Sequence, residues 1–304
     1  MKTITIQTTQ PKSLEAIMNE QNIQAICANV DGRLRELNYV IEGTHDITFL
    51  DLHVDQAMRI YETTLRYMIL KVLYEFDPRI QVTFNYSISR SIYMDIKASY
   101  SDDIILDIID NGLKQLIQDK LPITRVTLEK EEVLNLYKEA NMQHKTNIFT
   151  YRHDEVSRVY QCGNYMNYLY GYMLPNTSYI RDYRIFKYNN GYILQYPRAE
   201  FDASIPPFVE EETYKNTLKN VAKWSKIIEG DTIDKMNDYA TSCHSAVSLI
   251  QMSESKHSAM LYELAEDISK KYDTLKLIAI AGPSSSGKTT FARRLQVELQ
   301  ARGL

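Results

Sequence analysis

The stretch Leu275–Thr289, LKLIAIA-GPSSSGKT, contains the most specific pattern in this chain. Its second half fits G-x-x-x-x-G-K-[ST], the pattern of a phosphate-binding loop, and its first half is an apolar run of strand length. Downstream, Phe291, Leu295 and Leu299 recur at helical spacing, and Gly303 suits a helix end. The sequence therefore predicts a strand over 275–281, a phosphate loop and a following helix.

The residue types in this loop match the chemistry of phosphate binding. Gly282 and Gly287 permit backbone conformations that a β-carbon would block, so that N–H groups can point inward as an anion nest. Lys288 supplies a positive charge for the β- and γ-phosphates and is the predicted catalytic residue, and Thr289 offers its hydroxyl to Mg²⁺. The predicted cofactors are ATP and Mg²⁺. The predicted nucleotide-binding residues are Gly282, Pro283, Ser284, Ser285, Ser286, Gly287, Lys288, Thr289 and Thr290.

Upstream of the loop the hydrophobic pattern alternates between strand and helix periods. A long helix is predicted over Ala57–Phe76, where apolar residues recur every three to four positions up to Asp77-Pro78. The first fifty residues predict a small α/β unit with Ser13 as a helix N-cap and Asp31-Gly32 as a tight turn. Further segments are predicted as strands at 3–8, 23–30, 37–40, 47–50, 81–86, 91–96, 126–128, 156–161, 168–173, 185–188 and 192–195, and as helices at 104–117 and 130–141.

Composition and charge limit the classes of protein. The chain has 304 residues, enough for two or three domains, and its net charge of −4 gives no general basic footprint for nucleic acid. No apolar run reaches the length of a membrane span, so no membrane partner is expected. Cys27, Cys162 and Cys243 lie far apart, which favours a reduced, cytoplasmic location.

The phosphate loop and its flanks resemble the start of the uridine kinase/phosphoribulokinase family. The resemblance is carried by the serine-filled loop, by Thr289-Thr290-Phe291 and by Arg294-Leu295. It implies an ATP-dependent enzyme that transfers the γ-phosphoryl group to a hydroxyl of a uridine-like nucleoside. Because few residues follow Lys288, we expect this chain to be the N-terminal part of a longer kinase, inactive by itself. The acceptor site and the oligomeric state are left open.

The region before the loop resembles the threonyl-tRNA-synthetase-like half of a two-part nucleoside kinase family. Three stretches carry this resemblance: 50–52 followed by 58–61, 168–171 with 174–180, and the Ser253-Glu254 pair with His257. The implied fold class is α+β, with a ubiquitin-like β-grasp (TGS) module, an editing-domain-like α+β module and the first β-loop-α unit of a P-loop kinase domain. The implied domains are 1–50, 51–230, a helical linker at 231–273 and an incomplete kinase domain at 274–304.

Some features of the synthetase editing domain are missing from this sequence. The family has an H-x-x-x-H pair on its long helix and a later Cys/His pair, but 57–76 contains no histidine. We therefore predict no catalytic metal in the α+β module and interpret Cys162 as a buried structural thiol.

Two rival functions remain open at this stage. Residues 1–230 could recognise RNA, a tRNA-like end or a small metabolite, with the P-loop domain as a regulator, or the kinase acceptor could be another sugar or polyol. Arginines among the tyrosines of 160–196 suit single-stranded RNA, but strand propensity explains the tyrosines as well. RNA is therefore a less favoured partner than a nucleoside.

Overall fold

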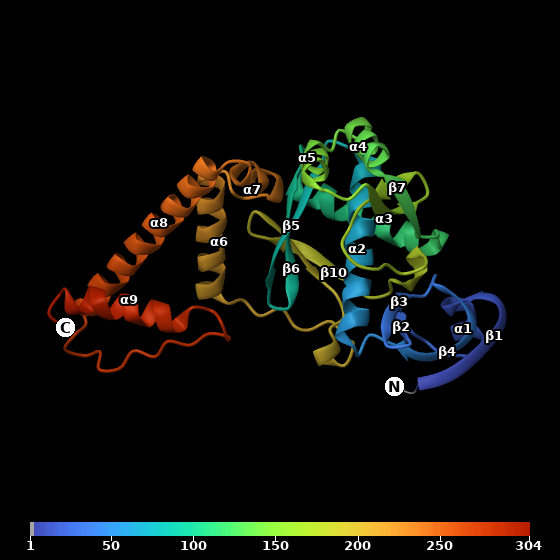
Figure 1. The fold of residues 1–304 in the computed structure, drawn as a ribbon, viewed down its shortest axis with the longest axis horizontal. Coiled ribbons are helices and arrows are strands. Elements are labelled where there is room, and N and C mark those ends of the chain that lie inside the picture. Colours follow the sequence, from blue (N-terminus) through green and yellow to red (C-terminus); the bar gives the residue numbers. More distant parts are fainter. Residues whose placement is uncertain (1–2) are drawn as a thin grey trace. The chain divides into compact units, whose positions relative to one another are not determined.

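The computed structural model describes residues 3–304 apart from the Cys243 side chain, and it divides into two compact units, 1–219 and 220–304 (Figure 1). The first unit is α+β, with three small antiparallel sheets, and the second is helical. Among the described residues, no helix combines the length and apolar character needed to span a bilayer.

The N-terminal module is a four-stranded antiparallel sheet with one helix packed on it. Its elements are β1 (Thr3–Ser13), α1 (Leu14–Glu20), β2 (Cys27–Val30), β3 (Arg33–Glu36) and β4 (Val40–Leu50), in the sheet order β1-β4-β2-β3. The predicted cap is confirmed, since Ser13 Oγ accepts a hydrogen bond from Ala16 N at 3.2 Å. The predicted turn is also confirmed, with φ of 49° at Asp31 and 77° at Gly32 between β2 and β3. Assignment of this module to the β-grasp fold stays a prediction.

The predicted strand at 37–40 is wrong over most of its length. The backbone carbonyls of Leu37 and Tyr39 accept hydrogen bonds from Glu15 N and Leu14 N, at 2.9 Å each, at the start of α1. These carbonyls are therefore unavailable to a neighbouring strand, and β4 begins only at Val40.

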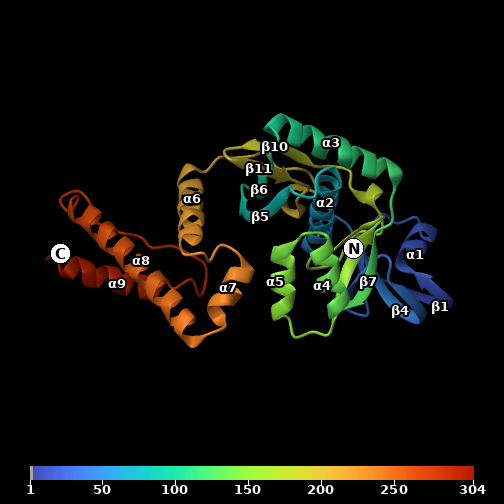
Figure 2. The same ribbon diagram turned by 90° about the horizontal axis from the view of Figure 1, so that it is seen from above.

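Helix α2 (Asp55–Phe76) is the centre of the larger module, and it begins and ends close to the predicted bounds. With α3 (Asp102–Asp119) it packs on a sheet of order β10-β11-β6-β5 (Figure 2). The strands are β5 (Gln81–Ile88), β6 (Ser91–Lys97), β10 (Arg184–Tyr188) and β11 (Gly191–Gln195). At Gly191 a β-carbon would lie 2.4 Å from Met94 O and 2.5 Å from the Tyr93 ring, so only glycine fits there. Phe76 was predicted on the buried face but is 50% exposed, because it lies in the last turn.

A third sheet has α2 packed on one of its two faces and two other helices packed on the opposite face. It contains β7 (Thr124–Glu129), β8 (Val156–Cys162) and β9 (Tyr165–Asn167), and the helices are α4 (Lys130–Glu139) and α5 (Gln143–Tyr151). The buried Tyr67 hydroxyl lies 3.0 Å from the carbonyl oxygens of Tyr160 and Tyr165, which fixes this sheet to α2. Short 3₁₀ turns at Thr177–Tyr179 and Ala199–Phe201 complete the module.

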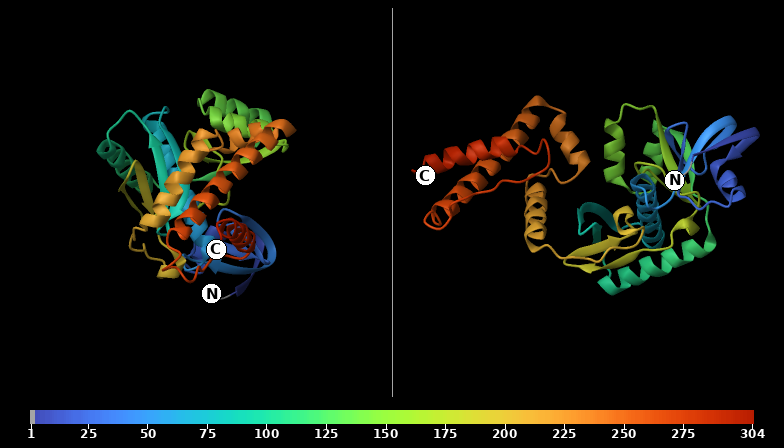
Figure 3. Two further views of the ribbon diagram at one scale, coloured as in Figure 1. Left: turned by 90° about the vertical axis from the view of Figure 1, so that its left-hand side faces the viewer. Right: turned by 90° about the horizontal axis from the view of Figure 1, so that it is seen from below.

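The second unit contains helices joined by irregular segments (Figure 3). Helix α6 (Glu212–Ile227) crosses from the first unit, and α7 (Ile233–Ala240), α8 (Cys243–Ser269) and α9 (Lys288–Gln300) follow. The predicted strand at 275–281 is wrong, because these residues have no regular secondary structure. A strand needs a neighbour for its backbone N–H and C=O groups, and the described residues provide none here.

Candidate functional site

The predicted phosphate loop leads directly into α9. Gly287 is the N-cap of this helix with φ of 79°, and Ser285 also has a positive φ, 61°. A β-carbon at Gly282 would lie 2.9 Å from Ser286 Oγ, which is closer than such contacts normally allow. Gly287 therefore has the left-handed conformation expected from the sequence, and the loop ends at a helix N-terminus, where backbone N–H groups attract anions.

The side chains of the loop are mainly solvent-exposed. Lys288 Nζ donates a hydrogen bond to Pro283 O at 2.5 Å, so its ammonium bridges the two ends of the loop. Thr289 and Thr290 are exposed at the start of α9. The arrangement brings together the predicted nucleotide-binding residues, whose assignment to a nucleotide stays a prediction.

Two residues singled out around the loop also meet. Arg294 of α9 lies 2.8 Å from His257 Nδ1 of α8 and donates to Ser258 Oγ at 3.0 Å. This contact, with the buried Leu261, Ala265 and Leu295, joins α8 to α9. The linker helix and the loop helix are therefore held together beside the loop.

A second candidate site lies in the first unit, where α2, α5 and the loop after β9 meet. Lys145 of α5 donates a hydrogen bond from Nζ to Tyr168 O at 3.2 Å, and it forms no ion pair within the part of the chain that is described. Burial, and secondarily the positive charge of Arg66, lowers the pKa of Lys145 to about 8. A lysine in this condition is a cation that lacks an acidic partner.

Arg66 of α2 is only partly satisfied. It pairs with Glu62 at 3.0 Å and lies over the Phe84 ring at 4.6 Å, but its buried Nε has no hydrogen-bond partner among the residues that the structure describes. Lys145 and Arg66 are therefore two cations on different elements, and among the described residues only Arg66 pairs with a carboxylate, that of Glu62. This cationic cluster, defined as Lys145 and Arg66, can bind an anion such as a phosphate or a carboxylate.

The loop beside the cationic cluster was predicted as a strand at 168–173, and this prediction is wrong. Instead its backbone is fixed by side chains: Tyr168 N binds Tyr137 Oη at 2.9 Å, and Leu174 N binds Thr64 Oγ1 of α2 at 3.0 Å. Tyr170 at the tip is 88% exposed. Long-range side-chain contacts of this kind leave no periodic signal in a sequence.

Cysteine does not contribute to this site. Cys162 is buried against Tyr67 and Tyr165, and its burial raises its pKa, as expected for an inert structural thiol. Within the described residues no three His, Cys, Asp or Glu side chains gather as metal ligands. The absence of a catalytic metal stays a prediction, and the Cys243 side chain lies outside the described residues.

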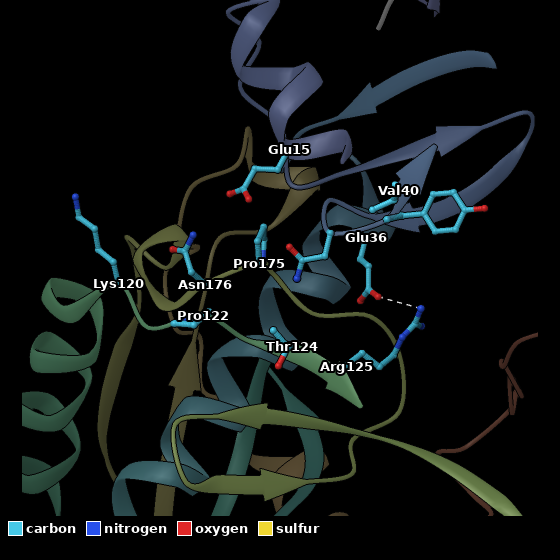
Figure 4. Close-up of a pocket in the computed structure, with 11 residues that line it drawn as sticks. Glu15, Glu36, Val40, Lys120, Pro122, Thr124, Arg125, Pro175 and Asn176 are labelled. Carbon is cyan, nitrogen blue, oxygen red and sulfur yellow. Dashed lines mark ion pairs between the residues drawn. The ribbon is translucent and has the colours of Figure 1, made fainter. Parts of the chain in front are cut away.

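A polar pocket of about 560 Å³ lies at the seam between the N-terminal module and the larger module (Figure 4). Its innermost charge is Glu36 of β3, which is 5% exposed. Glu36 pairs with Arg125 of β7 at 3.0 Å and accepts a hydrogen bond from Tyr160 Oη at 2.8 Å. This buried cluster joins the two modules and gives the pocket a rigid wall. The sequence provided no signal for it, because its members come from three separate strands.

Comparison with known proteins gives a consistent result for about half of the chain. No family model matches. The chain is 23% identical over 167 residues to the threonine–tRNA ligase of Desulfatibacillum aliphaticivorans, which covers 55% of the chain and 26% of that ligase. It is 25% identical over 176 residues to the enzyme of Halalkalibacterium halodurans, covering 56% and 27%. The chain thus matches about a quarter of the length of these curated relatives.

These similarities correct the function expected from the sequence. The nucleoside kinase function, with its uridine-like acceptor, is wrong, because the relatives are threonine–tRNA ligases and the similarity spans over half of the chain. The kinase expectation rested on about thirty residues around the loop, and a phosphate loop specifies an anion but no reaction. The comparisons therefore identify a threonyl-tRNA-synthetase-like N-terminal region in this chain.

Proposed function

We propose that this protein has an aminoacyl-tRNA-synthetase-related function and that its N-terminal region binds tRNA. The observation that carries the proposal is the cationic cluster of Lys145 and Arg66, in which Lys145 has no acidic partner in the described part of the chain. RNA backbones present phosphates, and cations supply most of the sequence-independent affinity for them. Because the chain is similar to threonine–tRNA ligases, we propose tRNA as the RNA that it binds.

The surroundings of the cationic cluster suit the end of an RNA strand. Tyr170, which follows two residues after the Tyr168 carbonyl that Lys145 binds, offers an almost fully exposed ring, and unpaired bases stack on such rings. The net charge of −4 argues against binding RNA along its whole surface. We therefore propose a local contact with a few nucleotides. We also propose that the chain is divided into domains at 1–50, 51–230, 231–273 and 274–304, with this contact in the domain 51–230.

The loop 282–290 is proposed as the site for ATP phosphates and Mg²⁺. Lys288 would exchange its bond to Pro283 O for phosphate oxygens, and Thr289 would offer its hydroxyl to the metal. Synthetase relatives make a nucleotide a reasonable second ligand.

The test is a direct binding measurement with the full chain. Fluorescence anisotropy with labelled tRNA, titrated at several salt concentrations, gives the affinity and the number of phosphates contacted. Lys145→Ala should weaken binding about tenfold and reduce the salt slope by roughly one. The matched control is Lys138→Ala, an exposed lysine on the neighbouring helix α4, which should change neither quantity. Equal binding by Lys145→Ala and the parent chain would refute the site.

A further inference from the structure

The polar pocket between the N-terminal module and the larger module, called the seam pocket from here on, contains hydrogen-bonding groups that the fold leaves unused. Glu15 of α1 accepts a bond from Tyr179 Oη at its Oε1, at 2.7 Å, which leaves Oε2 as an acceptor. Asn38 donates from Nδ2 to Ile123 O at 3.0 Å, so its Oδ1 is a further acceptor. Figure 4 shows Glu15 facing the Pro175 and Asn176 side of the pocket.

A donor lies on the opposite side of the same pocket. Asn176 Oδ1 accepts bonds from Ser178 N at 3.0 Å and Ser178 Oγ at 2.7 Å, so its Nδ2 group is left as a donor. These bonds also fix the orientation of the Asn176 amide. The pocket therefore presents acceptors from the N-terminal module and a donor from the larger module.

The remaining walls favour a flat ring with a phosphate attached. Pro122 and Pro175 are rigid and apolar, and they carry no backbone N–H group. Lys120 lies at the rim with an exposed ammonium that forms no ion pair in the described part of the chain. The Glu36–Arg125 pair is already neutral, so that Glu15 and Lys120 are the charges left for a ligand. The volume of about 560 Å³ exceeds that of one base and suits a nucleotide.

We propose that the seam pocket binds one unpaired nucleotide whose base is adenine or cytosine. Both bases present an amino donor beside a ring-nitrogen acceptor, which complements Glu15 or Asn38 on one side and Asn176 on the other. The amino group carries two hydrogens and can donate to both Glu15 and Asn38, whereas uracil has a single N3–H between two carbonyl oxygens and would leave one of these acceptors facing a carbonyl oxygen. Lys120 would contact the phosphate. The inference rests on the proposed RNA binding for its biological source, but the chemistry of the pocket is independent of Lys145.

The experiment uses the full chain with Lys288→Ala, so that the phosphate loop contributes no nucleotide binding. Isothermal titration with AMP, CMP and UMP should give affinities at least tenfold tighter for AMP and CMP than for UMP. Glu15→Ala should abolish this preference. Glu20→Ala is the matched control, because Glu20 lies on the same helix, pairs with Lys12 and does not line the pocket, and it should retain the preference. Lys120→Gln should weaken AMP but not adenosine.

Competition distinguishes the two sources of such a nucleotide. A short RNA with an unpaired adenosine at its end should displace AMP if RNA is the source, and it should fail to compete if the ligand is a free nucleotide. The inference is overturned if neither AMP nor the RNA binds, if UMP binds as well as AMP, or if Glu15→Ala has no effect. If tRNA binding through Lys145 persists in those cases, only the seam inference fails. AMP binding without tRNA binding would refute the proposed function alone.

Discussion

Residues 3–219 and residues 220–304 differ most in how much apolar surface they bury. The first unit contains four clusters of buried apolar residues around α2 and the three sheets. In the second unit, as far as it is described, one small cluster forms around Leu261, Ala265 and Leu295, while Leu277 is 83% exposed. The better packed unit has no sharp motif, and the loosely packed unit has the sharpest motif in the chain.

This contrast separates two kinds of information in a sequence. A phosphate loop is local, because fifteen consecutive residues determine its backbone and its charge. A core is non-local, because each element is stabilised by segments distant in the chain. A confident motif therefore says little about the stability or the function of the surrounding unit, and the kinase expectation failed for this reason.

The largest expected effect tests the difference in packing directly. Leu65→Ala, in the centre of α2, should lower the free energy of unfolding of the first unit by about 4 kcal/mol, because the cavity cannot collapse. Leu295→Ala should cost about 2 kcal/mol, since its small cluster can close around the gap. Urea unfolding followed by hydrogen exchange of each unit measures both. Equal losses would contradict the contrast.

The next effect concerns the seam. Arg125→Ala leaves the buried Glu36 carboxylate without its cation and should destabilise the first unit by about 3 kcal/mol. Arg158→Ala, an exposed arginine on the adjacent strand β8, is the control and should leave Tm unchanged. Glu36→Gln in the Arg125→Ala background should restore part of the loss. An unchanged stability in Arg125→Ala would mean that the buried pair contributes nothing to joining the modules.

A smaller effect follows from the pKa of Lys145. Because this pKa is lowered to about 8, the lysine is charged at pH 7 and largely neutral at pH 9, so tRNA affinity should fall about tenfold over this range. Lys145→Arg keeps its charge and should show a flat profile. The unfolded chain retains the proton up to about its ordinary value of 10.5, so stability should rise between pH 8 and 10.5. Fluorescence anisotropy across this pH range measures the expected fall in tRNA affinity, and thermal melts across the same range measure the expected rise in stability.

The smallest effect on stability is expected in the phosphate loop. Lys288→Ala removes only the bond to Pro283 O at an exposed site, so Tm should not change, while binding of Mg·ATP should be lost. Lys288→Arg should also fail to bind, because the planar guanidinium does not fit where a compact ammonium lies. Calorimetry with Mg·ATP measures this. Retained binding in Lys288→Ala would exclude the loop as the phosphate site.

Elements with local signals could be predicted from the sequence. Helix α2 was predicted within two residues at its start and to the residue at its end, because its apolar period and Asp77-Pro78 are both local. Ser13 and the Asp31-Gly32 turn were predicted for the same reason. The segments 168–173 and 275–281 were predicted as strands from apolar content alone, which cannot show whether a neighbouring strand exists.

The candidate site in the first unit could not be predicted. Lys145 lies on α5, a helix that periodicity did not indicate, and Arg66 lies among the polar positions of α2. Only the fold brings them to the same loop. The seam pocket depends in the same way on Glu15, Asn38 and Asn176, which lie in segments far apart in the chain. The loop 282–290 is the opposite case, since all of its residues are consecutive.

Helix α2 also determines how this protein can change. It is buried on several sides at once, since Tyr61 binds the backbone at Asp182, Thr64 binds Leu174 and Tyr67 binds β8 and β9. Substitutions should therefore be tolerated at few of its positions, chiefly Asp55, Gln56, Arg59 and Glu75, which are exposed. Arg66 is only partly buried, although its Nε is enclosed and its guanidinium lies over the Phe84 ring, so an exchange at this position during evolution should disturb the scaffold less than one at Tyr61, Thr64 or Tyr67.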